Sequence, residues 1–317
     1  MGGKSMNTGR WVIPLDEVPT HLTVSQYIFA KTDLAEWAKR VTPQCPGSHL
    51  ALPLKLDLEI LKNNLSELLK KYPAYSYPYG AAKSTPLYRM IYLTYNPKSE
   101  NPQINSPLPF EKKDFPPIEV TGITTGKNSY NDTLSIFEKT NFCHEPALAR
   151  LLEPIQRTIV RSRLAIHSGK MGGDKAQSQL SWHTDEKIFI NTRINIPVIS
   201  SSNFAIEYLH HDEHGGRLET FDLLEGFAYS FDTGKPHRFF AKENSEEERV
   251  SLILGISPWF DFCPEQRAWI SNEFYGKMHP LDMIYRGFVG DFFSASFAEE
   301  KISDFGKDEL HSYHSVT

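Results

Sequence analysis

Two stretches of the chain repeat apolar residues at the spacing of an amphipathic helix. Because one face of a helix recurs about every 3.6 residues, leucines three and four positions apart predict a helix with one buried side. Asp57 is suited to cap the first turn of such a helix, and Pro73 ends it. A second helix is predicted from about residue 145, with Pro146 in its first turn and Pro154 at its end. The first helix presents a stripe of leucines: Leu58, Leu61, Leu65, Leu68 and Leu69.

Between about residues 159 and 257 the apolar period changes to two, which is the period of a β-strand. The first of these strands has arginines and a histidine on one face and aliphatic residues on the other. In the second strand, Arg193 lies opposite a continuous aliphatic face. Turn-forming clusters separate the segments, so this region predicts an all-β sandwich or barrel. The predicted strands are 160–167, 188–198, 204–210, 217–223, 227–231, 237–240 and 249–256.

The flanking regions carry weaker patterns. Residues 6–50 show no sustained period, and the proline-rich stretch 73–117 predicts loops and edge strands. After Pro258, apolar residues return at helical spacing around Trp269 and Met283, which predicts helices packed on the β-structure. We therefore expect a mainly β protein with flanking helices. Its expected parts are an N-terminal helix and loop region (1–144), a β core (145–260) and a C-terminal helical extension (261–317).

Composition excludes several classes of function. The formal net charge of −5 gives no basic surface for nucleic acid or for an anionic membrane. Three cysteines, far apart and without a CxxC pair, indicate neither a disulfide framework nor a thiolate zinc site. No signal sequence is apparent, and the longest apolar run, Val250–Ile256, is too short to cross a bilayer. We expect a cytoplasmic protein, and the sequence leaves its oligomeric state open.

The segment Trp182-His183-Thr184-Asp185 carries two metal-ligating side chains two positions apart. Residues at i and i+2 of an extended segment lie on the same side, so His183 and Asp185 can bind one ion. His237 follows about fifty residues later, at the start of another strand. Two imidazoles and one carboxylate form the facial triad that binds Fe(II) and leaves coordination positions open. We take His183, Asp185 and His237 as the candidate metal ligands and catalytic residues.

A denser histidine cluster, Tyr208-Leu209-His210-His211-Asp212-Glu213-His214, is the weaker metal candidate. It lies between two predicted strands and contains the turn residues of a hairpin. Neighbouring histidines in a strand point to opposite faces and cannot bind one ion together. The favoured interpretation is a solvated hairpin tip, with a metal or substrate role as the alternative.

Arg249 opens the last predicted strand, twelve residues after His237. A guanidinium group can hold the carboxylate of a dicarboxylate cosubstrate, and Ser251, on the same face, can add a hydrogen bond. The alternative is a surface arginine paired with the acidic run Glu246-Glu247-Glu248. The arginine's position after the HxD motif and the later histidine favours the first interpretation.

Three segments together resemble the aspartyl/asparaginyl β-hydroxylase family, including the bacterial proline cis-hydroxylases, within the Fe(II)/2-oxoglutarate-dependent dioxygenases. The resemblance covers about residues 145–260 and implies a double-stranded β-helix, which is a jelly-roll, cupin-like barrel. By position it implies that His183, Asp185 and His237 bind Fe(II) and that Arg249 anchors 2-oxoglutarate, with Ser251 on the same face as a second candidate contact. The segments are WHTDEKIFINTRINIPV, EGFAYSFDTGKPHRFF and RVSLILGI.

The same resemblance implies a reaction and a substrate class. Arg163 and Arg193 match positions that hold carboxylates of substrate or cosubstrate, and Trp182 is a further candidate substrate contact. The implied activity consumes O2 and 2-oxoglutarate, hydroxylates an unactivated C–H bond and releases succinate and CO2. The implied substrate is a carboxylate-bearing small molecule: a free amino acid, an amino-acid derivative or a peptidyl residue.

One segment departs from the family pattern, and two other functions stay open. Between Gly169 and Trp182 the sequence KMGGDKAQSQLS is longer than the family's approach to HxD, which suggests a flap over the site. A JmjC-like protein hydroxylase or demethylase would present the same ligands, but with a lysine in place of the late arginine. A non-enzymatic, metal-binding cupin-like protein is the other alternative.

Overall fold

The fold is described from a computed structural model, which is mainly β with flanking helices, as predicted. The model describes residues 9–45, 49–53, 56–72, 74–76, 88–96, 133–170, 180–212 and 215–290, and it describes only the backbone at 53, 75–76, 180–183, 210–212 and 215.

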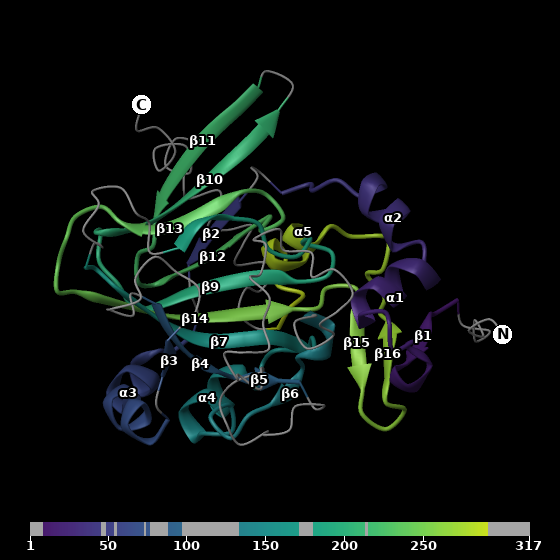
Figure 1. The fold of residues 1–317 in the computed structure, drawn as a ribbon, viewed down its shortest axis with the longest axis horizontal. Helices are drawn as coiled ribbons and strands as arrows, with labels where there is room; N and C mark the ends of the chain where they lie inside the picture. Colours follow the sequence, from purple (N-terminus) through teal and green to yellow (C-terminus); the bar gives the residue numbers. More distant parts are fainter. Residues whose placement is uncertain are drawn as a thin grey trace.

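Most of the predicted strands lie in one seven-stranded sheet, in which every neighbouring pair is antiparallel (Figure 1). Its centre is β14, which pairs with β7 on one side and β9 on the other. Residues from the N-terminal third extend both edges of this sheet. In sheet order the strands are β2 (His49–Pro53), β12 (Phe227–Phe231), β9 (Thr192–Ile199), β14 (Glu248–Ile256), β7 (Ile159–Ser168), β4 (Tyr88–Tyr92) and β3 (Tyr75–Ser76).

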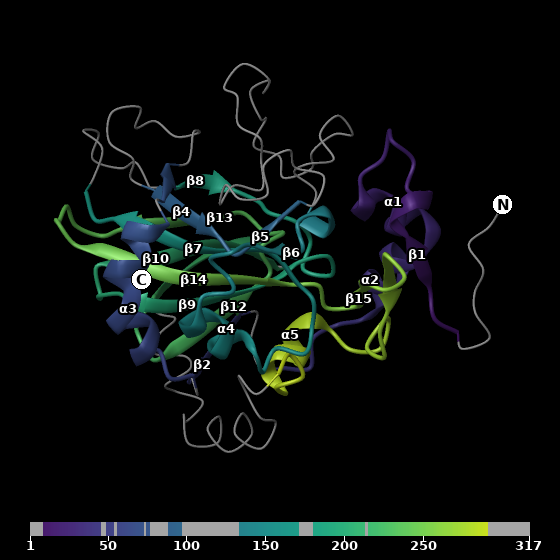
Figure 2. The same cartoon turned by 90° about the horizontal axis from the view of Figure 1, so that it is seen from below.

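A second, four-stranded sheet lies over one face of the first (Figure 2). An aromatic cluster that includes Tyr208, Phe221, Phe231 and Phe239 packs between the two sheets. No ladder of hydrogen bonds joins the two sheets among the described strands, so closure into a barrel is not seen. In order the strands are β11 (Gly215–Asp222), β10 (Phe204–Asp212), β13 (His237–Ala241) and β8 (Leu180–His183).

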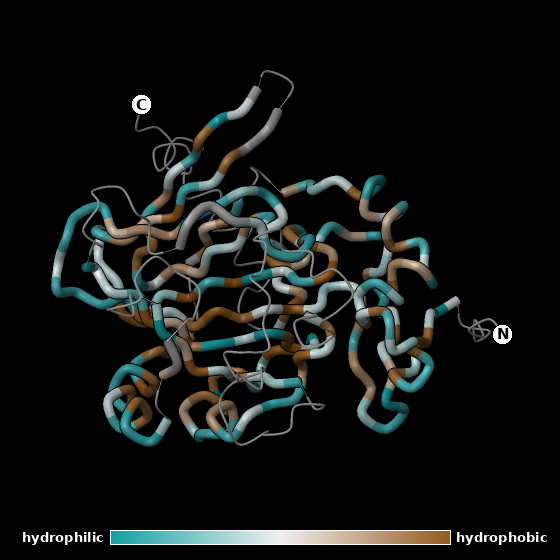
Figure 3. The backbone as a smooth tube through the Cα atoms, in the orientation of Figure 1, coloured by the Kyte–Doolittle hydropathy of each residue, from teal (hydrophilic) through white to brown (hydrophobic). Residues whose placement is uncertain are grey.

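Helices α3 (Glu59–Lys71) and α4 (Pro146–Leu152) cover the other face of the large sheet. Both were predicted, α3 from its leucine spacing and α4 from the prolines that bound it, and Pro146 occupies the first turn of α4. Each leucine buried in this layer contributes about 1.5–3 kcal/mol to stability. Figure 3 shows the alternation of hydrophobic and polar positions along the helices and strands. The layer contains Leu61, Leu65, Leu68, Leu148, Leu151, Leu164, Ile166, Leu252 and Leu254.

The prediction for residues 188–198 was wrong at its start, because β9 begins only at Thr192. The N–H groups of Ile190 and Asn191 donate to the carbonyl of Lys187 at 2.8 and 3.1 Å, so residues 188–191 form a turn. Ile188 and Ile190 are buried in that turn, and their alternation imitates a strand.

The helix expected around Trp269 was also wrong. Residues there form β16 (Ala268–Ser271), which pairs with β15 (Phe260–Cys263) and β1 (Val12–Pro14). A turn between β15 and β16, with Arg267 at φ 47°, gives this segment partners that local spacing does not reveal. Met283 does lie in a helix as predicted, α5 (Pro280–Tyr285).

The N-terminal region contains elements that the sequence patterns did not predict. A capping box between Thr23 and Gln26 starts α1, and the same signal could have identified this helix from sequence. No described helix is both long enough and apolar enough to cross a membrane. The remaining elements are η1 (Leu15–Glu17), α1 (Val24–Lys31), α2 (Leu34–Arg40), β5 (Thr94–Tyr95), η3 (Thr133–Ser135) and β6 (Glu138–Lys139).

Candidate active site

Asp185 and His237 meet at the end of the four-stranded sheet nearest the turn 232–236. The N–H of Asp185 donates to the carbonyl of Thr233 at 2.8 Å, which ties the segment after β8 to the turn before β13. Asp185 Oδ2 lies 3.5 Å from His237 Nε2. His237 Nδ1 lies 2.9 Å from the carbonyl oxygen of Lys235. If Nδ1 carries the proton and donates to that carbonyl, Nε2 presents its lone pair toward Asp185, which is the usual arrangement of a metal-binding imidazole.

The backbone places His183 beside these two residues. In the ladder between β8 and β13, His183 is the register partner of His237. Residues directly opposite each other in an antiparallel pair share a face of the sheet. The side chains of His183 and Trp182 lie outside the described residues, and the described side chains alone form no group of three His, Cys, Asp or Glu. The predicted triad is therefore represented by two side chains and one backbone position.

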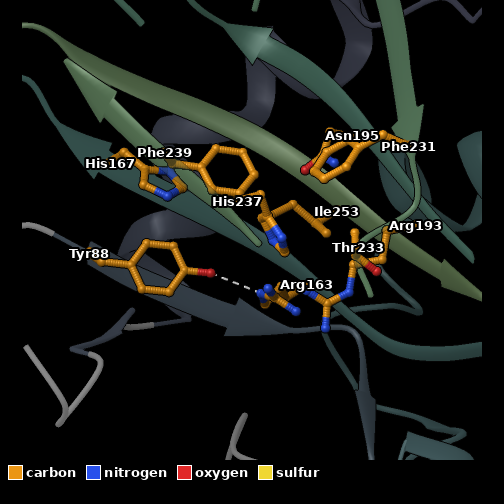
Figure 4. A pocket seen from close by; sticks show the side chains of 10 residues that line it. All are labelled: Tyr88, Arg163, His167, Arg193, Asn195, Phe231, Thr233, His237, Phe239 and Ile253. Carbon is orange, nitrogen blue, oxygen red and sulfur yellow. Dashed lines mark hydrogen bonds between the residues drawn. The ribbon is translucent and has the colours of Figure 1, made fainter. Parts of the chain in front are cut away.

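A pocket opens next to His237, between the two sheets (Figure 4). Its empty volume is about 320 Å³, which includes space open to solvent. His237 and Phe239 enter it from the four-stranded sheet, whereas Arg163, Arg193 and Ile253 enter it from the seven-stranded sheet. The pocket thus has the candidate metal ligand and two predicted carboxylate-binding arginines in its wall.

The guanidinium of Arg193 bridges two neighbouring carboxylates. Its Nη1 donates to Asp185 Oδ2, and its Nη2 donates to Glu186 Oε2 at 3.2 Å. Burial acts to raise the pKa of Glu186, but Arg161 and Arg193 beside it hold that pKa below its usual value. Glu186 is therefore ionised at neutral pH beside Arg193, which is predicted to bind cosubstrate or substrate.

Arg163 lines the same pocket as Arg193. Its Nε donates to the hydroxyl of Tyr88 at 2.9 Å, and its Nη1 lies 3.4 Å from the carbonyl of Arg161. None of the described carboxylates forms a salt bridge with Arg163. The Tyr88 ring packs on His167, which in turn packs on Phe239. The pocket accordingly has a cationic end at Arg163 and an aromatic end at Tyr88 and His167 (Figure 4).

Arg249 lies behind His167 and is 1% exposed. Its Nη2 lies 2.8 Å from His167 Nδ1, and its guanidinium stands 5.0 Å from the centre of the Phe239 ring. Burial lowers the pKa of Arg249 to about 9. Burial, with Arg249 and Arg163 nearby, lowers the pKa of His167 well below 6.5, so His167 is neutral at pH 7. Arg249 is thus a buried cation whose polar neighbour carries no charge.

Two polar atoms near this cation lack partners among the described residues. Arg249 Nε and Ser251 Oγ are both buried without a hydrogen bond. They stand two positions apart on one face of β14, as the sequence predicted. Buried polar groups are nearly always satisfied in native proteins, so such a pair suits a bound ligand.

Sequence patterns did not identify three residues of this region: Tyr88, Glu186 and Arg161. Tyr88 lies in the stretch that was read as loops and edge strands, and it reaches the pocket because β4 pairs with β7. Glu186 directly follows Asp185, and Arg161 lies on the charged face of the first predicted strand, so adjacency to the motif was the available signal.

Residues 208–212 of the histidine cluster lie in β10, which pairs with β11 as expected for the two arms of the predicted hairpin. Asp212 is the register partner of Gly215, and the pairing of β10 with β13 ends at Tyr208. Figure 1 shows this β10–β11 hairpin projecting away from the two sheets. Glu213 and His214 lie outside the described residues, as do residues 171–179 of the predicted flap.

Comparisons with known proteins give a distant similarity of fold. No family model matches the sequence, and no curated protein matches it. The non-heme alpha ketoglutarate dependent epimerase SnoN from nogalamycin biosynthesis is similar over 70% of this chain and 80% of its own, with 12% identity and a TM-score of 0.35. A 2OG-Fe(II) oxygenase family oxidoreductase from Burkholderia pseudomallei is similar over 75% of this chain and 90% of its own, with 11% identity and a TM-score of 0.35.

HygX from Streptomyces hygroscopicus, solved with nickel and 2-oxoglutarate bound, is similar over 74% of this chain and 86% of its own. Its identity is 10% and its TM-score is 0.32. Similarity at this level does not distinguish one subfamily of these oxygenases from another and assigns no role to a residue.

Proposed function

We propose that this chain is a non-haem Fe(II)/2-oxoglutarate-dependent oxygenase that hydroxylates a carboxylate-bearing small molecule or peptidyl residue. The strand order supports a jelly-roll core. The eight strands from β7 to β14 can be numbered one to eight in chain order. In the seven-stranded sheet, strands one, eight, three and six (β7, β14, β9 and β12) are then neighbours in that order. In the four-stranded sheet the order is two, seven, four and five (β8, β13, β10 and β11). This is the double-sheet arrangement of a double-stranded β-helix, in which ligands bind between the sheets.

The observation that carries the proposal is the meeting of Asp185 and His237. The two ligand atoms stand 3.5 Å apart, and His237 has its other ring nitrogen against a backbone carbonyl. Metal bonds to imidazole and carboxylate are about 2.0–2.2 Å long, so one ion can reach both atoms. His183, the register partner of His237, is the proposed third ligand. This nitrogen and oxygen set suits Fe(II).

Arg249 and Ser251 are the proposed anchor for the distal carboxylate of 2-oxoglutarate. A guanidinium and a hydroxyl, both buried with unused hydrogen-bonding atoms, suit a carboxylate that accepts two bonds. When bound, Fe(II) with 2-oxoglutarate and O2 supplies the oxidation of an unactivated C–H bond, with release of succinate and CO2.

The remaining pocket residues hold the substrate and exclude water. Arg163 is the proposed partner of the substrate carboxylate, because it lines the pocket and its described neighbours are the Tyr88 hydroxyl and a carbonyl. Arg193 is the second candidate, although Asp185 and Glu186 already share its charge. Phe231, Phe239 and Ile253 supply an apolar wall. Removing water strengthens each of these charged contacts.

Binding and turnover test the proposal in separate steps. We expect the chain to bind 2-oxoglutarate more tightly in the presence of Fe(II), measured by anaerobic titration, and to form succinate when O2 is admitted. Arg249→Met should lose 2-oxoglutarate binding. Arg238→Met is the matched control, because Arg238 is paired with Glu207 at neighbouring positions of β13 and β10.

The outcomes distinguish the alternatives. A wild-type chain that binds neither Fe(II) nor 2-oxoglutarate refutes the proposal. Fe(II) binding without any 2-oxoglutarate binding favours the non-enzymatic metal-binding protein. Binding of 2-oxoglutarate that survives Arg249→Met refutes the assignment of the anchor.

A further inference from the structure

Four donors from three segments of the chain converge on the carboxylate of Glu186. Its Oε1 accepts from Arg161 Nη1 and Thr133 Oγ1, and its Oε2 accepts from Arg193 Nη2 at 3.2 Å and Asn191 Nδ2 at 3.4 Å. The Glu186 side chain is 14% exposed. An exposed glutamate with one lysine partner contributes little to stability. A largely buried carboxylate that accepts four hydrogen bonds, by contrast, fixes the positions of the groups around it.

The position of Glu186 makes Arg193 the important one of these donors. Arg193 has one nitrogen on Asp185 and the other on Glu186. Asp185 is the proposed metal ligand, so Arg193 is in direct contact with the ligand atom nearest His237. Without a second carboxylate, the whole charge of Arg193 would act on Asp185.

Arg161 reaches Glu186 from a distorted point of the sheet. Two residues of β7, Arg161 and Ser162, stand opposite Leu254 of β14, where the register shifts. Arg161 has φ 45°, a left-handed conformation that costs a residue with a side chain about 1–3 kcal/mol. The Ser162 hydroxyl accepts the Gly255 N–H at 3.0 Å and so replaces the missing ladder bond. Bulges of this kind redirect side chains next to functional sites.

We propose that Glu186 is a positioning residue for the metal site, held by Arg161 and Thr133 and acting through Arg193 on Asp185. It neutralises Arg193 and fixes its guanidinium, which leaves Asp185 oriented toward His237 and able to accept a divalent cation. This inference rests on the proposed function, because it needs Asp185 to be a metal ligand.

Co(II) titration of the purified full chain tests the inference, with the absorbance of bound Co(II) as the readout. Glu186→Gln keeps the shape of the side chain and removes its charge. We expect Co(II) affinity to fall roughly 10–100-fold, as is typical when an outer contact of a metal ligand is removed. The absorption bands should also change, because they report the geometry of the ligands. A purely structural role would lower the melting temperature and leave both readouts unchanged.

Glu207→Gln is the matched control. Glu207 is 13% exposed, is paired with Arg238 and lies in the four-stranded sheet without a bond to Arg193. We expect this variant to bind Co(II) as the wild type does, with a similar change in melting temperature. Equal Co(II) affinities in Glu186→Gln and Glu207→Gln overturn the inference.

Arg161→Gly keeps the test valid if Glu186→Gln fails to fold. Glycine adopts positive φ without the penalty that Arg161 bears, so the bulge is retained while the guanidinium is lost. We expect a smaller loss of Co(II) affinity in the same direction, and wild-type affinity in this variant contradicts the inference. A wild-type chain that binds no Co(II) would instead refute the proposed function itself.

Discussion

Replacing Arg249 by methionine should stabilise the ligand-free protein and remove its response to 2-oxoglutarate. The side chain is 1% exposed, and burial lowers its pKa from the ordinary value of an arginine to about 9. A difference of that size corresponds to about 5 kcal/mol of unfavourable free energy for the charged group in the folded state. Methionine fills a similar volume, carries no charge and packs well against aromatic rings.

Favourable contacts of Arg249 offset part of this cost. The hydrogen bond to His167 contributes about 1 kcal/mol, and the cation–π contact with Phe239 contributes about 1–2 kcal/mol when buried. We therefore expect Arg249→Met to unfold with a free energy roughly 2 kcal/mol higher than that of the wild type. At pH 7 the full free-energy cost of the buried charge is present, since pH 7 lies below the pKa of Arg249 in both the folded and the unfolded state. The cost declines only as pH rises above about 9, where the folded state releases its proton first.

Urea denaturation in the presence of Mn(II), with and without 2-oxoglutarate, measures both effects. At a ligand concentration of about 100 times Kd, the wild type should gain about 2.7 kcal/mol, and Arg249→Met should gain nothing. A variant that is no more stable than the wild type without ligand would refute the view that the contacts of Arg249 offset only part of the cost of its burial. An undiminished response to 2-oxoglutarate would refute its role as the anchor.

Three further predictions follow from other sites. Asp185→Asn should lose Co(II) affinity by more than the roughly 10–100-fold of an outer contact, whereas His211→Ala in the hairpin should keep it; equal titrations would remove Asp185 from the metal site. Burial acts to raise the pKa of Glu219, but His49 and Arg217 beside it together outweigh burial and lower that pKa to about 2. The stabilisation that ionised Glu219 provides is therefore present above pH 4.5 and lost as pH falls toward 2. Glu219→Gln should thus lower the free energy of unfolding in urea at pH 7, and lower it less at pH 3. A difference that stays constant with pH would contradict the pairing. Gly255→Ala should destabilise by roughly 1–3 kcal/mol or more in the same assay, because the new methyl group would lie 2.1 Å from a backbone oxygen of β7, and a neutral result would show that the strands separate easily.

The sequence by itself determined the strands of the core and the order of the candidate ligands. Aliphatic and polar residues alternate along a strand that is buried on one side. This alternation can be read within a single segment, without knowledge of the strand's partners. The same pattern put Arg163, Arg193 and Arg249 on the faces that the structure turns toward the other sheet. The spacing of leucines likewise determined α3, whose packing surface is continuous along the helix, and the prolines at 146 and 154 bounded α4.

Only the tertiary structure decided which distant residues complete the site. Tyr88 reaches the pocket through the pairing of β4 with β7, and Thr133 reaches Glu186 across 53 positions of sequence. The strand around Trp269 exists because β1 and β15 supply its hydrogen bonds, although its local spacing is that of a helix. Such contacts depend on pairing between segments far apart in the chain, and no periodicity within one segment records them.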